Sequence, residues 1–336
     1  MASIVGHTQG VNNAIFDKES DLVYYLIADS GVLSYAGSLD VVAHEWAHGI
    51  TKYMSNLRGR REAGALNESF SDMFGVAVEW ANGSQNWVIA ETSYNNLTNP
   101  PDYLHSLYFP PSRQQAETWG EGWWKNPRLT GPDSCPNPDT TNDSCWVTRN
   151  MGIPNKMFYL LANGGFFNNV TVTGIGIQNA MAIMFRATFQ KYWKDSIDFA
   201  RAATGSIKAA FELNYVSSWP QQTSKAWTAV KVCDTMPGDA NGSGGIAITD
   251  VIYLVNYVFD KSRVSPPCNG TDPGTCWPID PNCQGELNGD ISVNIQDVIW
   301  LVNYVFDKSR DNPYCEGANP INCWLPIPTD VCCKLP

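Results

Sequence analysis

Hydrophobic residues along the first two thirds of the chain recur with the spacing of α-helices. Between residues 65 and 78 they lie on one stripe: Leu66, Phe70, Met73, Phe74 and Ala77. The same spacing, with Pro at a first turn and Gly at an end, predicts four more helices: 39–53, Pro154 to Gly164, 176–193 and 196–213. Residues 92–147 are rich in Pro, Gly and Trp and show no period, so we expect a long loop region there.

Two nearly identical segments follow nearer the C-terminal end. DVIYLVNYVFDKSR at 250–263 returns as DVIWLVNYVFDKSR at 297–310, which indicates a duplication. In each copy the apolar residues predict an amphipathic helix with one buried face. The turn-rich stretch CDTMPGD at 233–239 separates these copies from the helical part. We therefore expect two domains, residues 1–232 and residues 233–336.

Charge and cysteine content narrow the class of protein. The net charge is -11, with 33 acidic and 22 basic residues, which argues against nucleic acid or anionic lipid as a partner. The longest apolar run, LVYYLIA at 22–28, is too short for membrane insertion. Eight of the ten cysteines stand from Cys233 onward among Pro, Gly and Asn, as in a disulfide framework. We expect a secreted or cell-surface protein whose signal and pro-region lie outside this chain.

The segment VVAHEWAHGI at 41–50 carries the strongest chemical signal. His44 and His48 are four residues apart and share one helix face, so both can reach one metal ion, while Glu45 can reach a water beside it. A catalytic zinc needs a third protein ligand, and Glu68 in NESFSD is the candidate. Asp72, one turn later, can accept the free N–H of a ligating imidazole. The alternative is a pair of ordinary surface histidines.

These segments resemble those of the thermolysin-type zinc metallopeptidases. The likeness lies in VVAHEWAHGI, in GALNESFSDMFG at 64–75 and in NMGIPNKMFYLLANGG at 150–165, and it covers most of residues 4–232. It implies a mainly α fold: a helical lobe that follows a short, truncated β-containing segment. It also implies that His44, His48 and Glu68 hold zinc, that Glu45 is the general base and that Asp72 orients His44.

The resemblance further implies where a peptide substrate binds. QGVNNAIF at 9–16 is similar to the family's edge strand, so Asn13 and Ala14 would pair with an extended peptide backbone. Val41, Ile89 and Leu104 match positions that line the apolar pocket for the residue after the cut. Each of these three residues also fits an ordinary place in the core.

The residues that stabilise the oxyanion in this family are altered here. Thr148 stands where the family has a histidine, although its carboxylate partner, Asp143, remains. Gly59 replaces a tyrosine and His105 an arginine. Losing one such donor lowers the rate by about 10²–10³-fold, so we expect slow catalysis unless His105 substitutes. The alternatives are a plain loop histidine and, for the whole chain, a catalytically silent metal-bound protein that binds peptides or assembles with others.

Oxygen ligands in two regions indicate calcium. Asp40, Glu79 and Glu91 match acidic positions of the family's calcium site, with Asn86 where the family has a further aspartate, so we expect one calcium there; the alternative is a solvated acidic face. The repeats carry loops similar to those of EF-hands. The first loop offers Asp239, Asn241, Ser243 and Asp250. The second offers Glu286, Asn288, Asp290, Asn294 and Asp297, with Ile291 at the usual glycine position.

Two such loops, each followed by one helix, resemble a dockerin type I module. That likeness implies a cohesin-type scaffold partner, with a calcium-bound tail that docks to nothing as the alternative. Adjacent cysteines suggest three disulfides, Cys135–Cys145, Cys268–Cys276 and Cys315–Cys323, although spacing alone does not fix connectivity. The combined prediction is an exported, calcium-braced zinc endopeptidase that cuts before bulky apolar residues and is anchored through its tail.

Overall fold

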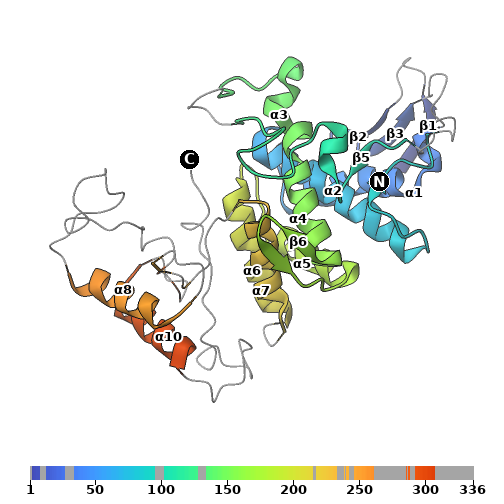
Figure 1. Cartoon of the computed structure of the whole chain (residues 1–336). Coiled ribbons are helices and arrows are strands. Elements are labelled where there is room, and N and C mark those ends of the chain that lie inside the picture. The colour runs from blue at the N-terminus through green and yellow to red at the C-terminus, as the bar shows by residue number, and fades with distance from the viewer. Residues whose placement is uncertain are drawn as a thin grey trace.

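The computed structural model describes residues 2–7, 13–26, 34–94, 102–127, 134–214, 217–232, 238, 240, 241, 246–260, 285, 287 and 292–306. It is mainly helical, as predicted (Figure 1). The helices are α1 (Leu39–Met54), α2 (Arg61–Ala81), α3 (Asp143–Asn150), α4 (Gly152–Asn163), α5 (Ile177–Phe189), α6 (Phe199–Asn214), α7 (Trp219–Ala229), α8 (Ile248–Phe259) and α10 (Ile295–Phe306). The strands are β1 (Ala2–His7), β2 (Ala14–Asp17), β3 (Leu22–Leu26), β4 (Val88–Ile89), β5 (His105–Ser106), β6 (Gly165–Phe167) and β7 (Val170–Val172). Short 3₁₀ turns lie at η1 (Tyr35–Gly37), η2 (Pro110–Arg113) and η3 (Thr140–Asn142).

Helices α1 and α2 pack against each other at close range. A Cβ at Gly75 of α2 would lie 2.6 Å from the carbonyl oxygen of Asp40 in α1, so only glycine permits this approach. Helix α2 begins four residues before the predicted start at residue 65, since its first turn carries charged and small residues that leave no hydrophobic period. The close packing sets the middle of α1 against the middle of α2.

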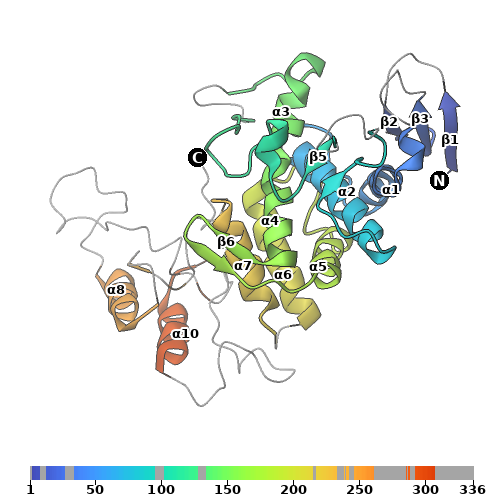
Figure 2. The same ribbon diagram turned by 45° about the vertical axis from the view of Figure 1, so that its right-hand side comes forward.

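Helices α4 to α7 form the rest of the helical core (Figure 2). Two fully buried tryptophans anchor this packing, and both indole N–H groups are satisfied. The Nε1 of Trp193 donates to the Ala202 carbonyl at 2.9 Å, and the Nε1 of Trp227 donates to the Ser206 hydroxyl at 2.7 Å. Because buried polar groups without partners are costly, these bonds fix each ring in one orientation.

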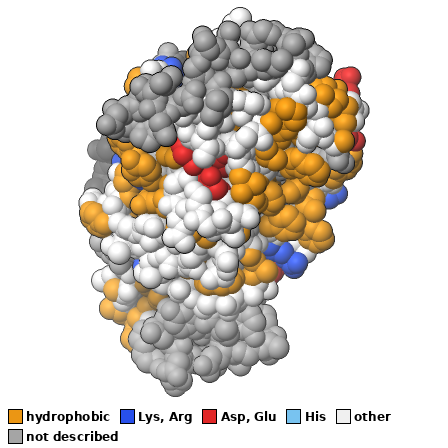
Figure 3. All heavy atoms as spheres, turned by 90° about the vertical axis from the view of Figure 1, so that its right-hand side faces the viewer, with side chains coloured by type: hydrophobic (Ala, Val, Ile, Leu, Met, Phe, Trp, Pro, Cys, Tyr) orange, Lys and Arg blue, Asp and Glu red, His pale blue; other side chains and the backbone are white. Residues whose placement is uncertain are grey.

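A small sheet lies on the other side of α1. Its strand order is β1-β3-β2, with β1 parallel and β2 antiparallel to β3, so β2 is an edge strand of the described sheet. Hydrophobic side chains cover much of the surface at this end of the molecule (Figure 3). Ile4, Val5 and Ile15 of the sheet are among the exposed apolar residues.

The segment predicted as a long loop contains more structure than its sequence suggests. Strand β5 lies within it and pairs with β4 just before it, and α3 was not foreseen. Asp143, Ser144, Cys145 and Trp146 at the start of α3 have φ of +52°, +49°, +67° and +68°, so the helix opens with a left-handed turn. Left-handed geometry costs about 1–2 kcal/mol per residue other than glycine, which is why no propensity rule predicts it. The predicted Cys135–Cys145 disulfide is present.

The repeated helices α8 and α10 pack against each other over a small apolar core of their own: Ala240, Val251, Leu254, Leu287, Val298 and Leu301. Several residues predicted to act in this region lie outside the described residues: Asp239, Ser243, Glu286, Asn288, Asp290, Cys268, Cys276, Cys315 and Cys323. Within the described ranges, no helix combines the length and hydropathy needed to cross a membrane.

Candidate metal centre and active site

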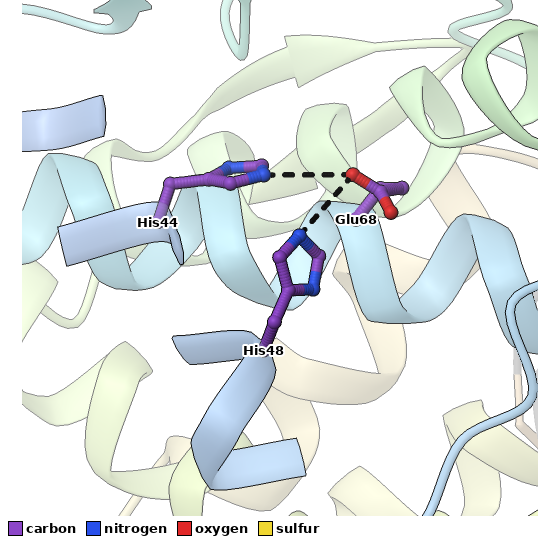
Figure 4. Close-up of side chains that lie close together, drawn as sticks. All are labelled: His44, His48 and Glu68. Carbon is purple, nitrogen blue, oxygen red and sulfur yellow. Dashed lines mark ion pairs between the residues drawn. The ribbon is translucent and has the colours of Figure 1, made fainter. Parts of the chain in front are cut away.

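Three side chains from α1 and α2 converge on one point. The Nε2 atoms of His44 and His48 lie 3.5 and 3.6 Å from the same carboxylate oxygen of Glu68 (Figure 4). The two histidines are one turn apart on α1, and their rings stand edge to face with centroids 4.8 Å apart. The three residues predicted from sequence are therefore brought together by the packing of α1 on α2.

The donor set fits a zinc ion. Ligands at tetrahedral zinc, with bonds near 2.0–2.2 Å, lie about 3.4 Å from one another, close to the separations found here. The Nδ1 atoms of both rings are engaged elsewhere, which directs the two Nε2 lone pairs toward Glu68. His44 Nδ1 lies 2.8 Å from Asp72, and His48 Nδ1 lies 3.2 Å from the hydroxyl of Ser71. Such outer contacts fix the tautomer that a metal requires.

Asp72 is fully buried, and its carboxylate contacts three polar side chains. Beside His44, its carboxylate contacts His105 Nδ1 at 3.1 Å and accepts from the Asn155 amide at 2.9 Å. Burial alone would raise the pKa of Asp72, but His105 and His44 outweigh it and hold that pKa well below its usual range. Asp72 therefore stays a carboxylate and ties the candidate metal ligand to a second imidazole.

Within this cluster the charges of the histidines and carboxylates offset one another. Burial raises the pKa of Glu68, but the neighbouring His48 and His44 lower it to about 2. Burial likewise lowers the pKa of His44, and the contacts with Asp72 and Glu68 raise it well above its usual value. A proton and a metal ion compete for the same Nε2 atom, so metal binding at this cluster must release protons.

The cluster opens into a cavity of about 470 Å³. Every residue predicted to contact substrate lines it: Asn13, Ala14, Val41, Ile89 and Leu104. Glu45, His105, Asp143 and Thr148 line it as well. The side chain of Glu45 makes no hydrogen bond with other described residues, so its carboxylate faces the cavity unengaged. Gly59 also borders the cavity, and a Cβ there would meet nothing within 4 Å.

Asp143 and Thr148 hold each other on one wall of this cavity. The carboxylate of Asp143 accepts from the Thr148 backbone N–H at 2.6 Å and from its hydroxyl at 3.0 Å. Burial raises the pKa of Asp143 despite these bonds. The single hydroxyl proton of Thr148 is thus directed at Asp143, so it is not available to an oxyanion in the cavity.

A second acidic cluster lies beside α1. Asp40, Glu79 and Glu91 each bring one carboxylate oxygen within 4.8 Å of the others. One oxygen of Glu91 is buried and has no hydrogen-bond partner among the described residues, and carboxylate oxygens are the ligands that hard cations prefer. Burial and the charges of Asp40 and Glu91 raise the pKa of Glu79 to about 7. The donor set of three carboxylates therefore fits a hard cation such as calcium.

Asn86 lies in the same cluster but in a different role from the one predicted. Its amide nitrogen donates to Glu79 at 2.9 Å and to Glu91 at 2.8 Å, while its carbonyl oxygen accepts from the Val88 N–H at 2.9 Å. An amide nitrogen has no lone pair for a cation. In this conformation Asn86 bridges the two glutamates, and ligation would need a rotated amide.

Four of the predicted ligands in the repeats fall in described positions. Asp250 is buried and accepts from the backbone N–H groups of Asn241 at 3.1 Å and Ala247 at 2.8 Å. Asp297 accepts from the backbone N–H groups of Leu287 at 2.7 Å and Asn294 at 2.8 Å. Each carboxylate therefore binds two backbone N–H groups that precede it in the chain, in the first turns of α8 and α10.

The sequence interpretation missed the polar residues behind the ligands. Asn67 and Ser71 contact His48 Nδ1, and Asn155 donates to Asp72 while its oxygen accepts from Ser69 at 2.7 Å. A signal for the first pair existed, because Asn67 and Ser71 are four residues apart and interrupt the apolar stripe of α2. Asn155 carries no such signal, since its partner stands on another helix.

Comparisons with known proteins agree with this geometry. A family model described as thermolysin metallopeptidase, α-helical domain, matches residues 55–232, and the catalytic-domain model matches residues 1–52. A bacillolysin from Bacillus cereus is 36% identical over 214 residues, covering 63% of this chain and 35% of the relative. A thermolysin from Alicyclobacillus acidocaldarius subsp. acidocaldarius is 34% identical over 212 residues, covering 63% and 36%.

A solved structure, the precursor of protealysin, a metalloproteinase from Serratia proteamaculans, has a TM-score of 0.51 and 27% identity. The match covers 68% of this chain and 67% of that one. The chain belongs to the thermolysin family of metallopeptidases. That family uses zinc and calcium. The chain spans about a third of the length of the curated relatives described above.

Replacing Asp72 tests whether its carboxylate supports the metal centre. We expect Asp72→Asn to bind zinc about 10–100-fold more weakly, because a neutral amide holds the His44 imidazole less well. Competition with a zinc-binding dye measures this affinity. Glu121→Gln, at a surface carboxylate paired with Lys231, is the control. Equal affinities in all three proteins would mean that Asp72 does not support the metal.

Proposed function

We propose that this chain is a zinc endopeptidase whose metal is held by His44, His48 and Glu68. The observation that carries the proposal is the approach of both Nε2 atoms to one Glu68 oxygen at 3.5 and 3.6 Å, at the edge of a cavity that Glu45 also lines. Family membership supports the same reaction. Because the chain covers a third of its relatives' length, its own activity is part of the proposal.

The reaction is hydrolysis of a peptide bond. Zinc held by His44, His48 and Glu68 would supply Lewis-acid chemistry: it would polarise the scissile carbonyl and lower the pKa of the attacking water. Glu45 takes the proton from that water and delivers it to the leaving amine. Asp72 holds the His44 ring in one tautomer throughout, and its own low pKa keeps it from competing for the proton.

The substrate backbone binds along β2. This strand is paired on one side only within the described sheet, and Asn13 and Ala14 border the cavity at its start. An extended peptide can add to such an edge through main-chain hydrogen bonds. We therefore propose protein or peptide substrates, bound in extended form with the scissile bond beside Glu45.

The residue after the cut is a bulky apolar one. Val41 and Ile89 are buried, with 5% and 1% of their surface exposed, and Leu104 is 37% exposed. The Leu104 N–H donates to the Ile89 carbonyl at 2.7 Å, which keeps these two side chains together on one wall. Burying an apolar side chain against them contributes about 1.5–3 kcal/mol to binding.

His105 is the candidate that supports the oxyanion, since Thr148 is committed to Asp143 and Gly59 has no side chain. Its Nδ1 is held by Asp72, and its Nε2 makes no hydrogen bond within the described part of the chain. An imidazole that donates from Nδ1 donates from Nε2 only as an imidazolium ion. His105 therefore serves in this role only while protonated, with Asp72 as its counter-charge.

A calcium ion braces the site through Asp40, Glu79 and Glu91. Asp40 belongs to α1, Glu79 to α2, and Glu91 follows β4, so an ion held by these three carboxylates would link the elements that carry His44, Glu68 and Ile89. It would neutralise the like charges that help raise the pKa of Glu79. We assign this ion a structural rather than a catalytic role.

The rival reading is a catalytically silent metal-bound protein that binds peptides. The engagement of Thr148 by Asp143 favours it, because no family-type oxyanion donor remains at that wall. The Glu45→Gln comparison below separates the two readings.

For the tail, we propose that residues 233–336 form a separate calcium-binding domain that docks to a cohesin-type scaffold at the cell surface. Support comes from the family models, which end at residue 232, and from the separate apolar core of α8 and α10. Asp250 and Asp297 each close one loop, as the last ligand of a calcium loop would. The exported location follows from the cysteine content.

Replacing Glu45 tests the peptidase function. In zinc and calcium, we expect this chain to cleave a quenched peptide with Leu or Phe after the scissile bond, and Glu45→Gln to lose at least about 10²-fold in kcat with zinc still bound. Fluorescence gives the rate and elemental analysis the zinc content. A folded, zinc-loaded wild type as silent as Glu45→Gln would exclude catalysis by this chain and favour the silent binding protein.

Calcium binding is expected to depend on pH. Glu79 has a pKa of about 7 in the metal-free fold against 4.5 in an unfolded chain, so the native state holds an extra proton between those values. Metal-free stability therefore falls as pH rises through this window, and calcium must displace the proton. At one fixed calcium concentration, about 100 times the Kd at pH 8, we expect Tm to rise by about 5–10 °C at pH 8 and by much less at pH 5, where the proton on Glu79 weakens calcium binding.

Melting curves with calcium and with chelator, measured from pH 5 to 8, check this dependence. Glu79→Gln is the matched control and is expected to lose both the calcium effect and its pH dependence. A calcium-induced rise in Tm that is the same at every pH would argue against the shared cluster.

Docking of the tail has a direct test. We expect calcium-dependent retention of the full chain on an immobilised cohesin, abolished in the double variant Asp250→Ala/Asp297→Ala. Surface plasmon resonance with and without chelator measures it, with Asp198→Ala as a control outside the repeats. If the chain binds no cohesin of a panel at saturating calcium, the docking proposal is wrong and the tail is only a calcium-bound domain.

A further inference from the structure

One wall of the cavity is built from a left-handed turn that contains no glycine. Asp143, Ser144, Cys145 and Trp146 all have φ between +49° and +68°, and helical geometry of the usual hand follows at Val147. Consecutive residues with side chains avoid this conformation because each Cβ approaches the next carbonyl oxygen. Such a turn persists only where surrounding contacts hold it.

The two ends of the turn carry the polar groups of that wall. Asp143 begins it, and Thr148 follows its end by two residues. The carboxylate of Asp143 spans the turn to reach both the backbone N–H of Thr148, at 2.6 Å, and its hydroxyl, at 3.0 Å. If the intervening residues took right-handed geometry, the chain would leave Asp143 in another direction, and these bonds would be lost.

Cys145 lies in the middle of the turn and is bonded to Cys135. Both cysteines are buried, with 0% and 6% of their surface exposed. Two hydrogen bonds also reach the turn, from the Ser144 N–H to the Asp139 carbonyl at 2.7 Å and from the Cys145 N–H to the Asn142 side chain at 2.9 Å. Both partners lie between the two cysteines, so these bonds tie the turn only to its own loop.

The loop in turn is tied to α2. The guanidinium of Arg61, the first residue of α2, donates to the Pro136 carbonyl at 2.9 Å, next to Cys135. The disulfide is therefore the covalent link between the left-handed turn and a point held by the helix that carries Glu68. No glycine and no second disulfide performs this task within the described residues.

We propose that the Cys135–Cys145 disulfide is a positioning element of the active site. It holds the left-handed turn, and through the turn it keeps Asp143 and Thr148 together on the cavity wall. Its effect on catalysis rests on the proposed peptidase function, whereas its effect on the geometry of the wall does not. The cysteines touch no reacting atom and act only through the turn.

The test compares four forms of the full chain. Cys135→Ser/Cys145→Ser removes the bond and leaves side chains throughout the turn. Cys135→Ser/Cys145→Gly/Trp146→Gly removes the bond but places glycine where φ is +67° and +68°. Wild type and Trp146→Gly, which keeps the disulfide, are the controls. Chemical reductants are avoided because eight further cysteines in the chain would also react.

The first readout is hydrogen exchange of the Thr148 amide, which donates to Asp143 in the intact turn. We expect it to exchange about 10-fold or more faster in the serine variant than in wild type, and at close to the wild-type rate in the glycine variant. The second readout is peptide cleavage. Because Thr148 is committed to Asp143 and donates nothing to an oxyanion, this wall acts only by shaping the cavity in which the scissile bond is positioned. We expect kcat to fall about 10-fold in the serine variant and to recover in the glycine variant.

Each outcome decides the proposal. Unchanged Thr148 exchange in the serine variant overturns it. Equal loss of protection in the serine and glycine variants also overturns it, because the disulfide would then act by closing the loop and not by holding the left-handed turn. If the serine variant fails to fold, a folded glycine variant with a protected Thr148 supports the proposal, and an unfolded one overturns it. The expected exchange pattern in a chain without peptidase activity would reject the proposed function alone.

Discussion

The close contact between α1 and α2 is the constraint on which the site depends. It exists because Gly75 has no side chain where the Asp40 carbonyl oxygen approaches. With the helices at this distance, His44 and His48 on one helix face Glu68 and Asp72 on the other. The same contact places Asp40 near Glu79, so the two candidate metal sites share one structural cause. A change in the spacing of these helices would disturb both sites together.

Around that contact, charge is balanced in two different ways. In the first cluster histidines offset carboxylates, which lowers the pKa of Asp72 and Glu68 and raises that of His44. In the second cluster carboxylates face one another, and the pKa of Glu79 and that of Glu91 rise. The first cluster carries its own counter-charge in its histidines, whereas the second holds only carboxylates and needs protons or a cation to offset their charge. The two clusters thus differ in where their counter-charge comes from.

Two polar contacts define the cavity near the metal cluster. Thr148 of α3 turns its hydroxyl to Asp143, while His105 of β5 reaches Asp72 of α2. The turn between Asp143 and Thr148 carries side chains at every left-handed position and a disulfide in its middle. The hydrogen bonds between Asp143 and Thr148, the left-handed turn between them and the Cys135–Cys145 disulfide therefore lie together at one wall of the cavity.

The sequence by itself determined the helical class, most helices to within a few residues, and the placing of His44 and His48 on one helix face. These follow from local spacing, because residues four apart on a helix share a face wherever the helix lies. It suggested Glu68 as a third ligand and Cys135–Cys145 as a pair, but only the packing of α1 on α2 and the fold of the loop bring those residues together. Only the tertiary structure decided that His105 and Asn155 meet Asp72, that Asn86 donates to two glutamates, and that α3 begins with the opposite hand. Those features join residues from separate elements or oppose local backbone preference, so no pattern along the chain encodes them.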